Sequence, residues 1–229
     1  MNCENADSCL VLSIPRSGTH VVMQILNSLG MKEYPALAKQ DDFWTKWDTH
    51  IQTIPDKGYF CFGNHAYPGK ARRLVEANRK GVFISRDPRD WAVSYGYHFR
   101  LTSGFKHIYE QFGINRLFEE SIKRFPGQLK RLKWRDYPNV YSTTFERLFQ
   151  NSFEEFTNIC NFLGIKITKK EIRRKIKELN SSSPKYKKNF RRGVVGDWRN
   201  YLLPEHMELC KKLLGQHLID EGYEKDLDW

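Results

Sequence analysis

Short runs of apolar residues interrupt a largely polar chain, and three of them have the pattern of buried parallel strands. They cover residues 9–14, 81–85 and 140–145. Each run is five or six residues long and is closed by polar residues or turn signals, as is typical of strands that are covered on both faces. A helical pattern follows each run, so strands alternate with helices along the chain.

The helices are predicted from apolar spacing and from the residues at their ends. Residues 17–29 carry apolar side chains at helical spacing, and Gly30 follows as a favoured residue just beyond a helix C-terminus. Capping-box patterns open two further helices, at Ser152-x-x-Glu155 and at Thr168-x-x-Glu171. The first of these ends at Gly164, and the last helix of the chain is expected to begin at Pro204 and to run to about residue 219.

Alternating strands and helices predict an α/β domain with a central, mainly parallel sheet flanked by helices. Such sheets bind ligands at the carboxyl ends of their strands. The hydrophobic content of 40% excludes a disordered chain. The sequence shows no repeat, low-complexity linker or domain boundary, so we expect a single domain over residues 1–229. Residues 179–190, which are rich in Ser, Lys and Asn, are predicted to form a mobile loop.

Basic residues exceed acidic ones by 38 to 27, which gives a net charge of +11. Residues 165–192 hold twelve Lys and Arg against Glu171 and Glu178, so most of the excess lies in this stretch. The excess predicts an anionic partner: phosphate, sulfate, nucleic acid or an acidic surface. Few aromatic residues interleave with these charges, so a stacking platform for nucleic acid is not evident and a solvated face that partly attracts an anionic nucleotide is favoured. A basic nucleic-acid-binding protein stays an alternative.

The five cysteines are scattered and show no C-x-x-C spacing, which favours a reducing compartment over a disulfide framework or a zinc site. Residues 1–7 are polar and acidic, and the apolar run over residues 10–14 is too short for a signal peptide or a membrane span. We therefore expect a cytoplasmic protein with no membrane span.

The segment Pro15-Arg16-Ser17-Gly18-Thr19-His20 follows the first strand and opens the first helix. Backbone N–H groups at a helix start, with a Gly that permits close approach and hydroxyls beside it, form a cradle for an anion. The leading Gly and the Lys of a nucleoside-triphosphatase P-loop are absent. The segment therefore indicates a phosphate that is bound without Mg²⁺, or else an ordinary strand-to-helix turn.

Arg86 follows the second strand, where its guanidinium can form a forked contact with a phosphate. If the next helix begins at Asp87 or Pro88, Ser94 lies about two turns along it. The alternative for Arg86 is a surface ion pair with Asp87 or Asp90.

A third basic motif reads Arg191-Arg192-Gly193-x-x-Gly196-Asp197-Trp198. Two arginines and a glycine before a turn suit a phosphate held by a loop. The alternative is that both arginines merely end the solvated basic stretch.

Taken together and in this order, the three motifs resemble those of the sulfotransferase family that uses 3′-phosphoadenosine 5′-phosphosulfate (PAPS), and most closely those of its cytosolic type. The first motif resembles the loop for the 5′-phosphosulfate, Arg86 with Ser94 resembles the 3′-phosphate pair, and the third motif resembles the C-terminal nucleotide loop. The resemblance runs from about residue 9 to residue 202. It implies a P-loop-like three-layer fold, PAPS as co-substrate, adenosine 3′,5′-bisphosphate (PAP) as product, and no metal.

The resemblance also implies roles for single residues. His65, in the segment Asn64-His65-Ala66-Tyr67-Pro68, is implied as the general base that removes a proton from the hydroxyl or amine of the acceptor. Arg16, where most of the family has Lys, is implied to stabilise charge on the bridging oxygen as the S–O bond breaks. The implied nucleotide-binding residues are Arg16, Ser17, Gly18, Thr19, His20, Arg86, Ser94, Phe145, Arg191, Arg192 and Gly193.

The chain also departs from the family pattern at other positions. Gly63 stands where the family often has Lys, which leaves a non-catalytic PAP-binding relative as an alternative. Phe145-Glu146-Arg147 replaces a Tyr-Glu-Asp segment, so Phe145 is expected to stack near the adenine without a hydroxyl contact. The short C-terminal dimer motif is matched by Arg199 and Glu208 only, which predicts a monomer or a weak dimer.

Aromatic residues gather between the motifs and predict a small-molecule acceptor, an aromatic or apolar alcohol, in an apolar pocket. For more than half of them, plain core packing is the expected role. They are Phe43, Trp44, Trp47, Tyr67, Tyr95, Tyr97, Phe99, Phe105 and Tyr109.

Overall fold

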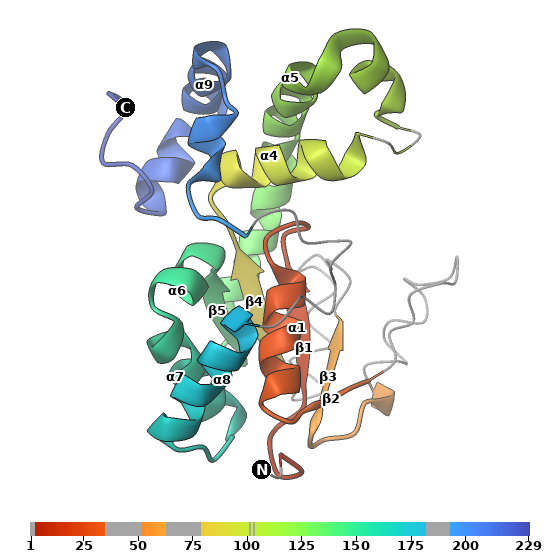
Figure 1. Cartoon of the computed structure of the whole chain (residues 1–229), viewed down its shortest axis with the longest axis vertical. Coiled ribbons are helices and arrows are strands. Elements are labelled where there is room, and N and C mark those ends of the chain that lie inside the picture. Colours follow the sequence, from red (N-terminus) through yellow and green to blue (C-terminus); the bar gives the residue numbers. More distant parts are fainter. Residues whose placement is uncertain (1–2, 35–51, 63–78, 101, 103, 182–192) are drawn as a thin grey trace. The chain divides into compact units, whose positions relative to one another are not determined.

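The structure, a computed structural model, describes residues 3–34, 52–62, 79–100, 102, 104–181 and 193–229 (Figure 1). It divides into two compact units, each built from two stretches of the chain. Unit 1 comprises Met1–Ser85 and Lys130–Lys187, and unit 2 comprises Arg86–Leu129 and Lys188–Trp229. The expectation of a single domain over residues 1–229 stays a prediction.

A five-stranded sheet forms the centre of unit 1, with the strand order β2-β3-β1-β4-β5 and parallel pairing throughout. The strands are β1 (Cys9–Ser13), β2 (Lys32–Glu33), β3 (Tyr59–Phe62), β4 (Lys80–Ser85) and β5 (Val140–Thr144). Every residue of β1 is buried, because this strand lies between β3 and β4 and is covered on both faces. The three predicted strands are therefore confirmed as parallel neighbours.

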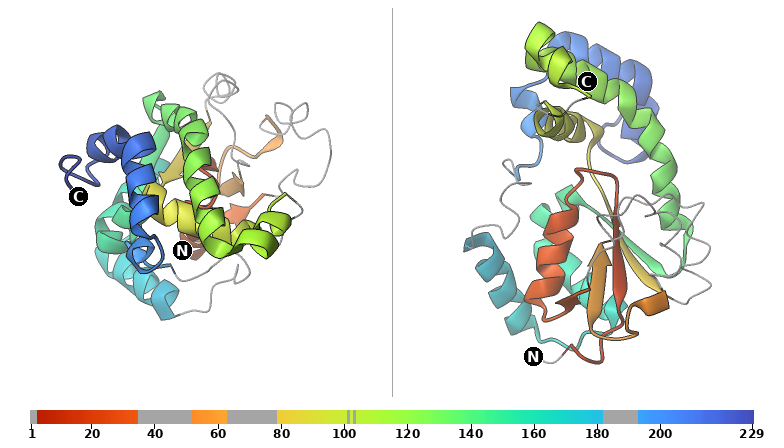
Figure 2. Two further views of the ribbon diagram at one scale, coloured as in Figure 1. Left: turned by 90° about the horizontal axis from the view of Figure 1, so that it is seen from above. Right: turned by 90° about the vertical axis from the view of Figure 1, so that its right-hand side faces the viewer.

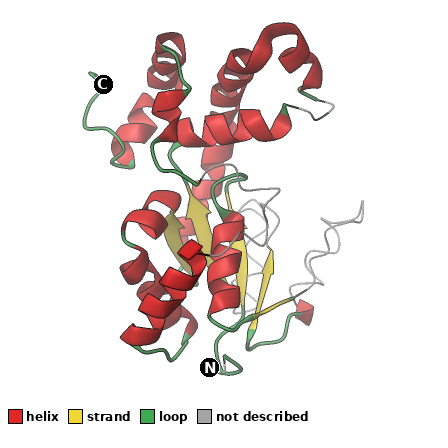
Figure 3. Ribbon diagram, in the orientation of Figure 1, coloured by secondary structure: helices red, strands yellow, loops and turns green. Residues whose placement is uncertain are grey.

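Helices cover the sheet of unit 1, which confirms the predicted fold class (Figures 1 and 3). Helix α1 (Thr19–Ser28) packs on one face through Val22, Ile25 and Leu26, and α8 (Lys169–Ser181) lies beside it. The end of the 3₁₀ segment η2 (Phe125–Asp136) lies on the opposite side of the sheet (Figure 2). Helices α6 (Phe145–Gln150) and α7 (Ser152–Leu163) follow β5.

Most of the predicted helix ends are confirmed. Gly30 and Gly164 have φ values of 93° and 70°, which place both in the left-handed region beyond their helices. Thr168 and Glu171 form the predicted capping box: the Glu171 carboxylate accepts from the Thr168 N–H at 2.9 Å, and the Thr168 hydroxyl accepts from the Glu171 N–H at 3.2 Å. Pro204 is the first residue of α9 (Pro204–Asp220).

The capping box predicted at Ser152 and Glu155 is wrong. Asn151 is the N-cap residue of α7, and the buried Glu155 carboxylate turns towards β5 instead. It accepts from the Thr143 hydroxyl at 2.5 Å and the Tyr141 hydroxyl at 2.9 Å, and it also forms an ion pair with Arg147. Leaving a buried carboxylate without partners costs more free energy than leaving a helix end uncapped, because water can reach the helix end.

Two predicted boundaries shift by a few residues. Phe145 begins α6 and does not end β5, because the Thr144 side chain caps that helix by accepting from the Arg147 N–H at 3.2 Å. The loop predicted over residues 179–190 begins later, since α8 continues to Ser181. The rest of that prediction, residues 182–190, lies outside the described residues.

Unit 2 is helical and contains α4 (Pro88–Phe99), α5 (Lys106–Arg124), η4 (Asp197–Asn200) and α9. Its core cluster is formed by Val93, Phe118 and Trp198, one side chain from each of the first three elements. Helix α5 is kinked at Gly113, whose φ of 78° interrupts the helical backbone. Within the described ranges, no helix is both long and apolar enough to cross a lipid bilayer.

Candidate functional site

The loop between β1 and α1 has an unusual backbone. Arg16 has a φ of 69° although it carries a side chain, and Gly18 has a φ of 106°. A non-glycine residue in the left-handed region is costly, and such strain clusters at ligand-binding sites. A Cβ atom added to Gly18 would lie 2.8 Å from Cδ2 of Phe145 and 3.1 Å from Cδ1 of Ile84. Glycine is therefore required here both by the backbone and by the close approach of the Phe145 ring.

The hydroxyls of this loop are buried and differ in their partners. The Thr19 hydroxyl lies 2.6 Å from the Ser13 hydroxyl, which ties the start of α1 to the end of β1. The Ser17 side chain is 0% exposed, and its Oγ has no hydrogen-bond partner among the described residues. In a folded protein, a buried hydroxyl without a protein partner commonly bonds to a ligand or a water molecule.

His20 lies one residue into α1 and is half-buried, with its ring stacked on Phe62 at 6.5 Å between ring centroids. Burial lowers the pKa of the His20 ring, and the nearby Arg16 guanidinium lowers it further. The imidazole is therefore mainly neutral at pH 7, and can offer a hydrogen bond to an anion but not a full positive charge.

Phe145, the predicted adenine-stacking residue, is buried between the Gly18 backbone and the Phe149 ring. The two aromatic rings are 4.5 Å apart between centroids. Phe149 is partly exposed, whereas Phe145 is almost completely covered. Phe145 thus helps to shape the loop, and its contact with adenine stays a prediction.

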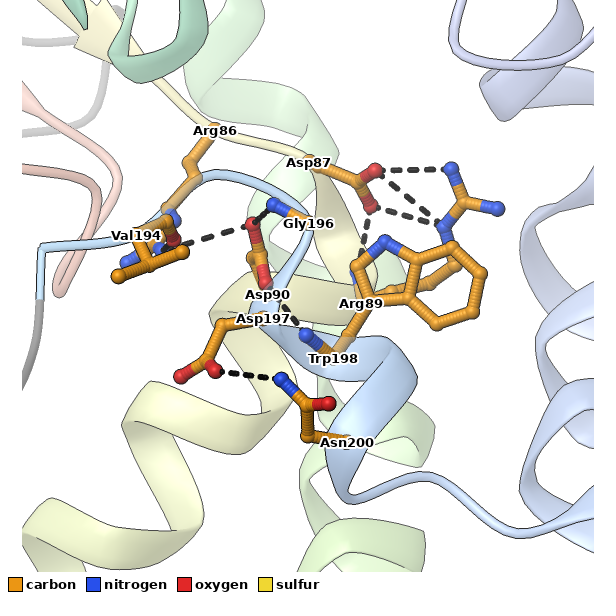
Figure 4. A network of polar contacts seen from close by, with 9 residues as sticks. All are labelled: Arg86, Asp87, Arg89, Asp90, Val194, Gly196, Asp197, Trp198 and Asn200. Carbon is orange, nitrogen blue, oxygen red and sulfur yellow. Dashed lines mark hydrogen bonds and ion pairs between the residues drawn. The ribbon is translucent and has the colours of Figure 1, made fainter.

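In unit 2, Arg86 directly follows β4 and is buried (Figure 4). Its guanidinium donates to the Val194 carbonyl at 3.0 Å and lies 3.5 Å from the Asp90 carboxylate. The ion pair considered for Arg86 is thus formed with Asp90, but in the interior and not at the surface. Ser94 is buried on α4 and lies four residues after Asp90, on the same face of that helix.

Three predicted residues, His65, Arg191 and Arg192, lie outside the described residues. Gly193 is described and has a φ of 69°, in the left-handed region that favours glycine. The structure adds Ser13 and Asp90, for which no role at the site was predicted. The only sequence signal for Asp90 was its spacing of four residues from Arg86, which fits an ion pair.

Several aromatic residues predicted near the acceptor belong to the packing of unit 2. Tyr95 contacts the rings of Trp91 and Phe99 at 4.5 and 4.3 Å between centroids. Tyr97 contacts those of Phe118 and Tyr201, each at 5.5 Å. Four of the other predicted aromatics lie outside the described residues: Phe43, Trp44, Trp47 and Tyr67.

Comparison with known proteins decides which family this loop and this fold represent. The family model of the sulfotransferase domain matches residues 6–222. The chain belongs to the sulfotransferase family. This confirms the resemblance to that family that the three sequence motifs indicated.

Curated relatives of this sulfotransferase are distant in sequence. Sulfotransferase 2A1 of Macaca fascicularis is 22% identical over 250 residues, which cover 93% of this chain and 85% of the relative. Luciferin sulfotransferase of Photinus pyralis is 26% identical over 161 residues, which cover 67% of this chain and 43% of the relative.

Solved structures share the fold of this sulfotransferase. Mouse sulfotransferase SULT7A1 complexed with PAP superposes with a TM-score of 0.73 at 20% identity, covering 95% of this chain and 87% of the other. Retinol dehydratase in complex with androsterone and inactive cofactor PAP gives a TM-score of 0.63 at 20% identity, covering 96% and 84%. With the family match, these findings make the protein a PAPS-dependent sulfotransferase, an enzyme of sulfuryl transfer.

Proposed function

We propose that this sulfotransferase transfers the sulfuryl group of PAPS to a hydroxyl or amine of a small acceptor, with His65 as general base. The loop Arg16–Thr19 with His20 is assigned to the 5′-phosphosulfate. Arg86, Ser94 and the arginines and glycine at 191–193 are assigned to the 3′-phosphate, and Phe145 to the adenine side. No metal is assigned a role.

The observation that carries this proposal is the buried hydroxyl of Ser17, which has no hydrogen-bond partner in the part of the chain that the structure describes. It lies just before α1, where the first N–H groups of a helix have no partners within the helix and the helix dipole favours an anion. The left-handed Arg16 and Gly18 on either side set the path of this turn. A phosphate oxygen would satisfy the hydroxyl and the N–H groups together, which is what PAPS requires of this loop.

The residues divide the chemistry among them. When bound, PAPS supplies the sulfuryl group and the bisphosphate leaving group. Arg16 holds a permanent positive charge beside the 5′ end of the nucleotide, and because arginine does not lose its proton, it stabilises charge without donating a proton. His65 accepts the proton of the acceptor, since an imidazole titrates near neutral pH.

We propose an apolar or aromatic alcohol as the acceptor class. One structural relative was solved with androsterone, which carries a hydroxyl on an apolar skeleton. The aromatic residues between the motifs of this chain suit such a skeleton, although Tyr95 and Tyr97 already pack within unit 2.

Nucleotide binding is tested by a thermal shift with PAP, with adenosine 5′-phosphate as the comparison and Mg²⁺ omitted. Ligand at about 100 times its Kd adds about 2.7 kcal/mol, which raises the Tm of a chain of this size by about 5–10 °C. A larger shift with PAP than with adenosine 5′-phosphate supports the assignment of a 3′-phosphate site. Equal shifts, or none with either nucleotide, contradict it.

Ser17→Ala gives a sharper test of the phosphate loop. Since the Ser17 hydroxyl has no partner among the described residues, its removal should leave the free energy of unfolding of the ligand-free protein within about 0.5 kcal/mol of wild type. The affinity for PAP should fall about tenfold, as expected for a lost hydrogen bond to a charged group. Denaturant unfolding and calorimetric titration measure the two quantities.

Ser142→Ala is the matched control. The Ser142 hydroxyl is also buried without a partner among the described residues, but it lies within β5 and not in the loop. This variant should change neither stability nor affinity for PAP. A Ser17→Ala protein that loses stability but binds PAP normally would show that the hydroxyl serves the fold alone.

A further inference from the structure

Asp90 is a fully buried carboxylate that joins two segments of unit 2 (Figure 4). Its side chain is 0% exposed and lies in the first turn of α4. Oδ2 accepts from the Gly196 N–H at 2.7 Å, and Oδ1 accepts from the Trp198 N–H at 2.8 Å. Oδ2 also lies 3.5 Å from the guanidinium of Arg86. One carboxylate therefore contacts a cation and two backbone N–H donors, and the donors belong to a loop more than 100 residues later in the sequence.

The helix itself does not need Asp90. Asp87 is the N-cap residue of α4, and its side chain already accepts from the Arg89 N–H at 2.8 Å. A buried carboxylate is costly unless it is paired and hydrogen-bonded. Burial raises the pKa of Asp90, while Arg86 and the two N–H groups act against that rise. The contacts that balance this cost all involve Arg86 or the loop that follows Gly193.

The same loop is tied at a further point. The guanidinium of Arg86 donates to the Val194 carbonyl, so residues Val194, Gly196 and Trp198 are each held by Arg86 or Asp90. Gly196 has a φ of 74°, and an added Cβ atom would lie 2.6 Å from the guanidinium of Arg199. The left-handed backbone at Gly196 therefore favours glycine, and the N–H groups of Gly196 and Trp198 both donate to the Asp90 carboxylate.

We propose that Asp90 is a positioning residue for the 3′-phosphate site: it fixes the Arg86 guanidinium and the loop 194–198 in their binding arrangement before the nucleotide arrives. This inference rests on the proposed function, in which Arg86 and Gly193 hold the 3′-phosphate. Without Asp90, the loop and the guanidinium would become ordered only when the nucleotide binds. The free-energy cost of that ordering would weaken the binding. Only ligands with a 3′-phosphate would be affected.

The test compares PAP with adenosine 5′-phosphate on the full chain carrying Asp90→Asn or Asp90→Ala. Asparagine has the size of aspartate but only one acceptor oxygen, so it can satisfy one of the two N–H groups. We expect the affinity for PAP to fall about tenfold in Asp90→Asn and further in Asp90→Ala, with the affinity for adenosine 5′-phosphate within twofold of wild type. Isothermal titration at one fixed salt concentration measures both.

Asp87→Asn is the matched control. It removes the same charge at the start of α4, but the side chain that donates to the Asp87 carboxylate is that of Arg89, whereas the backbone N–H groups of Gly196 and Trp198 donate to Asp90. Asparagine also remains a good N-cap residue. The ratio of the two affinities should therefore stay within twofold of wild type in this variant, even if its Tm falls.

Amide hydrogen exchange in the ligand-free wild-type protein tests the arrangement independently of any variant. The N–H groups of Gly196 and Trp198 should exchange slowly, because a buried carboxylate accepts from both. Exchange of both amides at the rate of an open loop would overturn the inference. So would an Asp90→Asn protein that keeps the wild-type preference for PAP, or one that loses affinity for both nucleotides equally. If the wild-type protein itself shows no preference for PAP over adenosine 5′-phosphate, the proposed function is wrong. Slow exchange would then show only that Asp90 holds the loop 194–198.

Discussion

Replacing His65 by alanine should lower kcat by at least about a hundredfold and leave the affinity for PAP within about twofold of wild type. The acceptor must lose a proton as its oxygen or nitrogen bonds to sulfur, and general-base catalysis contributes about 10²–10⁴-fold to such steps. His65 is the third residue after β3, which pairs in parallel with β1. The carboxyl ends of both strands therefore meet at one edge of the sheet, where the loop proposed to bind the 5′-phosphosulfate begins.

The measurement is initial-rate kinetics with labelled PAPS, together with titration of PAP into the same preparation. His107→Ala is the control, since His107 is exposed on α5 in unit 2 and carries no assigned role. Added imidazole should restore part of the lost rate in the His65→Ala protein, because it can accept the proton in place of the side chain. A variant with unchanged kcat would remove His65 from the mechanism, and a parallel loss of PAP affinity would move it to nucleotide binding.

Gly18→Ala should reduce the free energy of unfolding by about 3 kcal/mol and the affinity for PAP by more than about a hundredfold. The added Cβ atom would meet the buried Phe145 ring at 2.8 Å, and alanine would have to adopt a φ of 106°. Backbone strain and overpacking cost about 1–3 kcal/mol each. If the loop relaxes to avoid them, the N–H groups at the start of α1 turn away from the phosphate, and the anion site is lost.

Gly127→Ala provides the comparison, because an added Cβ atom would contact nothing within 4 Å there and the backbone is not left-handed. We expect it to keep both stability and affinity for PAP. Thermal or denaturant unfolding and titration with PAP decide the outcome. If Gly18→Ala binds PAP as wild type does, the loop does not serve as the phosphate site, whatever its effect on stability.

The sequence by itself determined the elements whose signals are local. The apolar runs predicted β1, β4 and β5, and the glycines and proline at helix ends predicted where α1, α7 and α9 begin or end. These signals depend on a few neighbouring residues, so they can be interpreted without knowing the rest of the fold. The motif around Ser17 and Gly18 is also a local signal, and the anion cradle that its residue types indicate stays a prediction.

Tertiary structure alone decided the partners of the buried charges. Ser152-x-x-Glu155 has the local form of a capping box, but Glu155 bonds to hydroxyls of β5, and Asp90 bonds to N–H groups more than 100 residues away. The short β2, with two exposed residues, carries no apolar signal and exists through its pairing with β3. In each case a buried polar group, or an unpaired strand edge, forms hydrogen bonds with a group that lies nearby only in the folded chain. Spacing along the chain cannot reveal that partner, because the free energy of leaving such a group unsatisfied depends on the whole surrounding fold.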